Sequence, residues 1–157
     1  MRTTKILSTL VENKPGTLFK VVHLIRLMRI NIEGLALGVT NRGDTCRMVF
    51  TVDGDDATLE HIAKQLQKVI DVLEATTYSP EEVTSRELAL VRIRASDRSR
   101  GLMSKFHGHK ILDSSNKELV VQVVGSPAEI DDFVQKLGSD VLDIARTGVT
   151  ALPRERA

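Results

Sequence analysis

The chain has 157 residues, of which 41% are hydrophobic and 27% charged, with a formal net charge of +1 at pH 7. This composition predicts one or two packed globular domains and excludes a disordered or fibrous protein. Nucleic acid is not expected as a partner, because phosphate contacts need a basic surface and base stacking needs aromatic side chains, and the chain has no Trp, one Tyr and four Phe.

The cysteine content and the lengths of the apolar runs predict where the protein works. Cys46 has no second cysteine to pair with, and it lies in a strand-like stretch, which favours a buried structural residue. No run of about 18 apolar residues predicts a membrane span, and no apolar leader follows Met1. We expect a cytoplasmic protein, or an organellar one after removal of a transit peptide, with no membrane partner.

The first 78 residues alternate between β-prone and helical patterns. Residues 3–11 predict a strand, and residues 17–28 place apolar residues at helical spacing. Residues 31–40 and 45–52 predict two strands joined by a hairpin turn. A second helix capped by Asp55 or Asp56 carries Leu66, Val69 and Ile70 on one face, and a strand over residues 72–77 follows it. The predicted order is β-α-β-β-α-β.

The remaining sequence repeats this order after residues 79–84, which are polar and predict a linker. Strands are expected over residues 88–93, 110–113 and 119–124, a short helix over 98–106, and a longer helix beginning at Pro127. At an offset of 71 residues Gly54 matches Gly125 and Leu66 matches Leu137, so the two halves resemble each other. The predicted fold class is α+β, with two ferredoxin-like βαββαβ domains over residues 1–78 and 85–157.

Motifs for catalysis or metal binding are not evident. The sequence has no phosphate-binding glycine loop, nucleophile elbow or cysteine pair for zinc. His107 and His109 supply two of the four ligands that structural zinc needs, and a solvated turn accounts for them. The acidic residues Asp53, Asp55 and Asp56 lack calcium-loop spacing and precede a helix, whose N-terminus attracts them. We therefore expect no catalytic residue, no metal and no cofactor in this chain.

The segment Asn13-Lys14-Pro15-Gly16-Thr17-Leu18 is the best candidate for a ligand site. Glycine permits close approach to the backbone, and the N–H groups of residues 16–18 at the positive end of a helix suit a carboxylate. An ordinary capped loop explains the same residues equally well. Asn31, between Ile30 and Ile32, either ends the helix or bonds an amino acid held by a second copy.

Six segments, each a weak signal alone, together carry a family resemblance: residues 10–18, 31–35, 47–50, 62–72, 86–91 and 144–149. With these segments the sequence resembles the small, regulatory subunits of acetohydroxyacid synthase (acetolactate synthase) over nearly its whole length. Cys46 and Gly34 stand where that family more often has Ser, Thr150 where Val is usual, and the segment 97–106 is shorter than the corresponding helix.

This resemblance implies an N-terminal ACT domain that forms a homodimer and binds valine, or else isoleucine or leucine, at the dimer interface. The implied effector site takes Asn13, Pro15, Gly16, Thr17 and Leu18 from one chain, and Asn31 and Ile32 from the other. The second domain is implied to activate a catalytic large subunit that holds thiamine diphosphate, Mg²⁺ and FAD. The alternative is a free-standing ACT-domain amino-acid sensor that regulates another enzyme or transcription.

Overall fold

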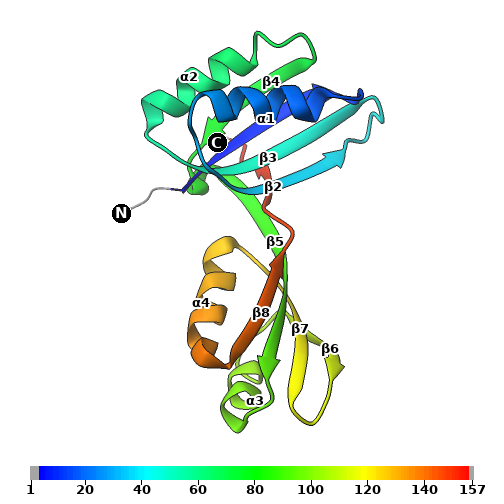
Figure 1. The fold of residues 1–157 in the computed structure, drawn as a ribbon, viewed down its shortest axis with the longest axis vertical. Helices are drawn as coiled ribbons and strands as arrows, with labels where there is room; N and C mark the ends of the chain where they lie inside the picture. The colour runs from blue at the N-terminus through cyan, green and yellow to red at the C-terminus, as the bar shows by residue number, and fades with distance from the viewer. Residues whose placement is uncertain (1–3, 156–157) are drawn as a thin grey trace. The chain divides into compact units, whose positions relative to one another are not determined.

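The computed structural model describes residues 4–155, which form two compact units. The first unit extends to Ser85 and also includes the C-terminal segment from Gly148, and the second unit spans Arg86–Thr147. Each unit has the order β-α-β-β-α-β, and one further strand lies near the C-terminus (Figure 1). The predicted fold class, α+β with two ferredoxin-like units, is confirmed.

The first unit is a four-stranded antiparallel sheet with two helices on one face (Figure 1). The strand order is β2-β3-β1-β4, so β2 and β4 are the edge strands. On the two central strands, alternate residues such as Leu7, Val11 and Phe50 are fully buried beneath the helices. The elements are β1 (Thr4–Glu12), α1 (Thr17–Leu27), β2 (Ile32–Val39), β3 (Thr45–Asp53), α2 (Asp56–Leu66) and β4 (Val72–Tyr78).

The second unit repeats this arrangement, with the strand order β6-β7-β5-β8. Val91, Val121 and Phe133 form part of its own hydrophobic core. A short 3-10 helix, η1 (Pro80–Glu82), precedes this unit. Its elements are β5 (Val83–Arg94), α3 (Asp97–Met103), β6 (His109–Ser114), β7 (Glu118–Gly125), α4 (Pro127–Leu137), η2 (Gly138–Asp140) and β8 (Val141–Arg146).

Three of the four α-helices begin at a residue whose side chain accepts a backbone N–H. Asp55 caps α2 by accepting from the Thr58 backbone at 2.8 Å, and this bond lowers the pKa of its carboxyl group. Ser96 and Ser126 form capping boxes at the starts of α3 and α4. α1 differs, because it follows Gly16, which has no side chain.

The C-terminal segment packs against the N-terminal sheet on the face opposite the helices. Val149 and Ala151 are buried there beside Ile6 and Val49. The strand β9 (Thr150–Pro153) pairs with β5, and the Arg154 backbone N–H donates to the Glu82 carbonyl at 2.9 Å. The first structural unit therefore contains residues from both ends of the sequence. The cause is long-range apolar burial, which local sequence patterns do not report.

Gly148 is needed for this packing. Its φ is +80°, and a Cβ at this position would lie 2.7 Å from the carbonyl oxygen of Leu35 on β2. A side chain here would therefore meet backbone atoms that cannot turn away. Glycine both adopts this conformation and lets the segment approach β2 closely.

One smaller expectation differs from the structure. α2 ends at Leu66, and Ile70 is 91% exposed, so the prediction that Ile70 belongs to the buried helical face is wrong. Residues 79–84, predicted as a linker, form η1 and the start of β5. Ser79 and Glu82 make a capping box there, which orders a polar stretch without burying it.

Candidate functional site

The turn between β1 and α1 is held in place by backbone hydrogen bonds. The Asn13 N–H donates to the Asp44 carbonyl at 2.8 Å, which ties the turn to the β2–β3 hairpin. Lys14 N–H donates to the Glu12 carbonyl at 2.9 Å, and Gly16 then takes a φ of +86°. This left-handed conformation favours glycine and directs the chain into the helix. The predicted ligand loop is therefore a tight turn at a helix N-terminus.

The first turn of α1 exposes backbone donors with no competing acceptor. Gly16 provides no side-chain cap, and the first turn contains no acidic residue. The N–H groups of Gly16, Leu18 and Phe19 have no acceptor among residues 4–155. The Thr17 N–H, expected to be free, instead donates to the Lys14 carbonyl at 3.3 Å, so that detail of the prediction is wrong. The remaining donors and the helix dipole suit a carboxylate.

Side chains around this turn add both polar and apolar contacts. The Asn13 side-chain amide donates to the Gly43 carbonyl at 3.3 Å, which leaves its oxygen facing no donor within residues 4–155. Thr17 is 2% exposed, and its hydroxyl has no partner in the described part of the chain. Pro15 is exposed, and Leu18 is partly exposed. The turn thus carries an amide acceptor and an apolar side chain in addition to the free N–H groups.

Two lysine–carboxylate pairs lie next to the turn. Lys20 on α1 pairs with Asp71, which is buried, and this hydrogen bond lowers the pKa of the Asp71 carboxyl group against the opposing effect of burial. Lys14 pairs with Glu12, which raises the pKa of the lysine. Both pairs are balanced in charge. The positive potential at the turn therefore comes from the helix N-terminus more than from these lysines.

Asn31 and Ile32 lie at the other end of α1. The helix has 11 residues, so about 16 Å separates its two ends. Asn31 is exposed and Ile32 is half-buried at the start of β2. The structure thus brings Asn13, Pro15, Gly16, Thr17 and Leu18 together within one chain and leaves Asn31 and Ile32 apart from them.

Two family sequence models match consecutive parts of the chain. Residues 7–74 match the AHAS small subunit-like ACT domain, and residues 86–155 match the small subunit of acetolactate synthase. The acetolactate synthase small subunit of Mycolicibacterium smegmatis is 35% identical over 155 residues, an alignment that covers 96% of this chain and 91% of that protein. The chain belongs to the acetolactate synthase small-subunit family.

Further members of this family resemble the chain over its whole length. The acetolactate synthase small subunit of Haemophilus influenzae is 34% identical, with 96% of this chain and 95% of that protein covered. The crystal structure of the acetolactate synthase small subunit from Thermotoga maritima superposes with a TM-score of 0.85 at 32% identity, covering 98% of this chain and 99% of that one. Family membership supports a regulatory, non-catalytic role beside a catalytic large subunit.

The histidines and the cysteine considered in the sequence analysis do not belong to the candidate effector site. No group of three or more metal-ligating side chains occurs within residues 4–155. His109 Nδ1 lies 2.6 Å from the Phe106 carbonyl oxygen, in the turn before β6. Cys46 is buried in the first core, in agreement with its predicted structural role. Within the same residues no helix is both long and apolar enough to cross a membrane.

The sequence reasoning missed a second concave region, on the face of the N-terminal sheet opposite the helices. Arg47 and Gly38 lie there on neighbouring strands. An arginine among the apolar residues of β3 was the available signal, because a charge within a buried strand marks the face that is not covered by helices. The position of the C-terminal segment, which forms part of this region, has no comparable local signal.

Proposed function

We propose that this small subunit binds a branched-chain amino acid, valine in the first instance, at an interface between two copies of its N-terminal unit. The bound effector would cause feedback inhibition of a catalytic large subunit that carries thiamine diphosphate, Mg²⁺ and FAD. Residues 85–157 would help to activate that subunit. The observation that carries the proposal is the separation of the two halves of the predicted site to opposite ends of α1.

A two-fold dimer would reunite these halves. If two copies of α1 pack antiparallel, the N-terminus of each lies beside the C-terminus of the other. Asn31 and Ile32 of one copy would then approach the Asn13–Leu18 turn of the other. The same symmetry would pair two β2 edge strands antiparallel, with Ile32 of one copy opposite Val39 of the other if the strands overlap fully.

The exposed apolar residues of the first unit support this interface. Phe19 and Leu27 on α1 are 72% and 65% exposed, although both are large hydrophobic residues. Leu37 and Val39 on β2 point to the helix-covered face, as their partners Met48 and Cys46 do, but remain 49% and 60% exposed. An edge strand and a helix with such side chains favour association with a second copy.

The turn then supplies complementary chemistry for an amino acid. The free N-terminal N–H groups of α1 would bind its carboxylate, and Asn31 of the second copy, together with the Asn13 side-chain oxygen, would accept from its ammonium group. Leu18 and Ile32 would contact a branched aliphatic side chain. Family membership favours this function over a free-standing sensor. A cytoplasmic location stays a prediction from the sequence.

Subunit mixing tests the two-chain site directly. Gly16→Asp and Asn31→Ala homodimers should each fail to bind valine in calorimetry, because each damages both copies of the site. Mixed dimers contain one doubly damaged site and one intact site, so mixing should restore part of the binding. If the two residues acted within one chain, mixing would restore nothing. A strictly monomeric protein in sedimentation with valine present would also contradict the proposal.

The regulatory part of the proposal needs the reconstituted enzyme. The full-length chain would be combined with the large subunit, and acetolactate formation measured with and without valine, isoleucine and leucine. We expect a rate higher than that of the large subunit alone, and inhibition by at least one of the three amino acids. An unchanged rate would contradict activation, and insensitivity to all three would contradict feedback inhibition.

A further inference from the structure

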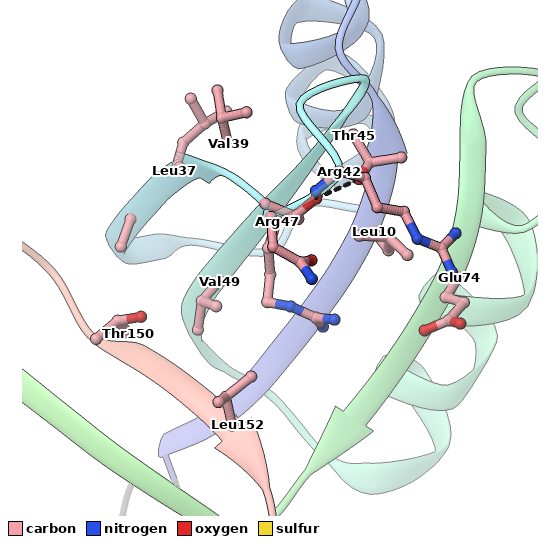
Figure 2. Close-up of a pocket in the computed structure, with 14 residues that line it drawn as sticks. Leu10, Leu37, Val39, Arg42, Thr45, Arg47, Val49, Glu74, Thr150 and Leu152 are labelled. Carbon is pink, nitrogen blue, oxygen red and sulfur yellow. Dashed lines mark hydrogen bonds between the residues drawn. The ribbon is translucent and has the colours of Figure 1, made fainter.

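The face of the N-terminal sheet opposite the helices carries a cavity of about 610 Å³ (Figure 2). Its walls come from β2 and β3, from the hairpin between them, from β1 and β4, and from Thr150 and Leu152 of β9. All of these residues belong to the first unit. None of the seven predicted effector residues lines it, so the cavity is separate from the α1 turn. Its volume is that of a site for a small molecule.

Arg47 is the principal polar group of this cavity. Its side chain is half-buried, and its Nη1 donates to the Ser8 hydroxyl at 3.1 Å. Across residues 4–155 its guanidinium makes no ion pair, although Glu74 also lines the cavity. Leu10 on β1 pairs with both Arg47 and Glu74, so two strand spacings, about 9 to 10 Å, separate their Cα atoms. A half-buried cation with unused N–H donors favours an anion beside it.

The space beside Arg47 is open. Gly38 on β2 is its cross-strand partner, and a Cβ added to Gly38 would meet nothing within 4 Å. Arg42, in the hairpin turn, lines the same cavity, and its side chain makes no ion pair within the described residues. Two arginines against one glutamate leave an excess positive charge, and Leu10, Val49 and Leu152 add apolar walls (Figure 2).

We propose that this cavity binds a small organic anion, in which a carboxylate or phosphate group contacts Arg47 and Arg42 and a compact apolar part contacts the leucine and valine walls. This ligand differs from an amino-acid effector, because it has no ammonium group and therefore needs no acceptor for one. Because β9 forms one wall, the bound anion holds the C-terminal segment against the sheet.

Two probes without an ammonium group distinguish the sources of the anion. The full-length chain is titrated by calorimetry with isovalerate, a branched carboxylate, and separately with inorganic phosphate. We expect saturable binding of at least one probe. Arg47→Gln should weaken it at least tenfold, about 1.4 kcal/mol. Arg92→Gln is the matched control, because Arg92 is an exposed arginine on β5 in the second unit, and it should bind as the unchanged protein does.

Substitutions at Gly38 distinguish the effect of side-chain charge on binding from the effect of side-chain size. Gly38→Asp places a carboxylate beside Arg47 and should prevent binding of either probe, whereas the equally large Gly38→Asn should retain most of it. Equal binding by these two variants would overturn the proposal, as would unchanged binding in Arg47→Gln or the absence of saturable binding in the unmodified chain. Valine binding by Arg47→Gln should be unaffected, because Arg47 lies on β3, away from the proposed β2 interface, so failure of the effector site and failure of this cavity give different results.

Discussion

The two helices that follow the first strand of each unit begin in different ways. α1 starts after Gly16 with no side-chain cap and no acidic residue in its first turn. α3 starts after Ser96, whose hydroxyl accepts from the Ser99 N–H at 3.0 Å, and Asp97 occupies its first turn. Repeated folds therefore present different helix ends, one with free N–H donors and one already satisfied by the chain's own side chains. This difference supports the proposal that the effector binds to the first unit.

The faces of the two sheets that lie opposite the helices differ as well. On the N-terminal sheet, Val149 and Ala151 of the C-terminal segment bury Ile6 and Val49. On the C-terminal sheet, the side chains opposite the helices include Leu90 and Val124, which remain 38% and 41% exposed. One sheet has thus acquired a second apolar layer within its own unit, and we expect its stability to depend on residues from the distant end of the sequence.

The largest expected effect on ligand affinity comes from a carboxylate side chain in the turn before α1. Gly16→Asp places a carboxylate among the free N–H groups, where it competes with the carboxylate of an amino acid and should weaken valine binding more than tenfold, about 1.4 kcal/mol. Gly16→Asn is the control, since Asn has the same size and tolerates the left-handed conformation that Gly16 adopts, with φ at +86°. Equal calorimetric affinity of the two variants would show that the carboxylate does not bind at this helix end.

The covered face gives the largest expected effect on stability. Val149 is 3% exposed, so Val149→Ala removes two buried carbons and should lower the free energy of unfolding by about 1.6 kcal/mol or more. Val124→Ala makes the same change at a residue that is 41% exposed and should cost clearly less. Urea denaturation of both variants measures the difference. Equal losses would mean that the C-terminal segment does not cover the sheet in solution.

Removing the N-terminal cap of α3 tests whether the second unit takes part in effector binding. Ser96→Ala removes the cap and the hydrogen bond from the Ser96 hydroxyl to Asp140, which is 2.8 Å long. The free energy of unfolding should fall by about 1 kcal/mol, while valine affinity stays unchanged. A loss of valine binding in the folded variant would place part of the effector site in the second unit.

The smallest effect concerns pH. Lys20 lowers the pKa of Asp71 below its ordinary value of 3.8, so the unfolded state takes up a proton at higher pH than the folded state does. The stabilisation is therefore complete above the unfolded pKa and is lost as the pH falls through the lowered folded pKa. Asp71→Asn should reduce the melting temperature at pH 7, and the difference from the unchanged chain should shrink below pH 3.8. Asp132→Asn, which breaks an exposed ion pair with Lys136, should have little effect at either pH.

Much of the fold followed from local patterns. Alternating and helical apolar spacing predicted the strands and helices. Asp55 or Asp56 was expected to cap α2, and Pro127 to open α4. The loop 13–18 was also identified as a turn at a helix start. The prediction failed where the same local sequence is compatible with two structures. Ile70 continued an apolar helical pattern, but the helix ends at Leu66, so this side chain faces solvent.

The sequence by itself determined the repeated βαββαβ order, the glycine at the start of α1 and the family resemblance, because each depends on residues close together in the chain. Only the tertiary structure decided that the Thr17 N–H is used by Lys14, and that Val149 covers a sheet whose first strand begins at Thr4. It also placed Asn31 at the end of α1 away from the turn of the same chain, about 16 Å from it. The physical reason is that burial and donor availability depend on contacts between distant segments, which spacing along one segment does not encode.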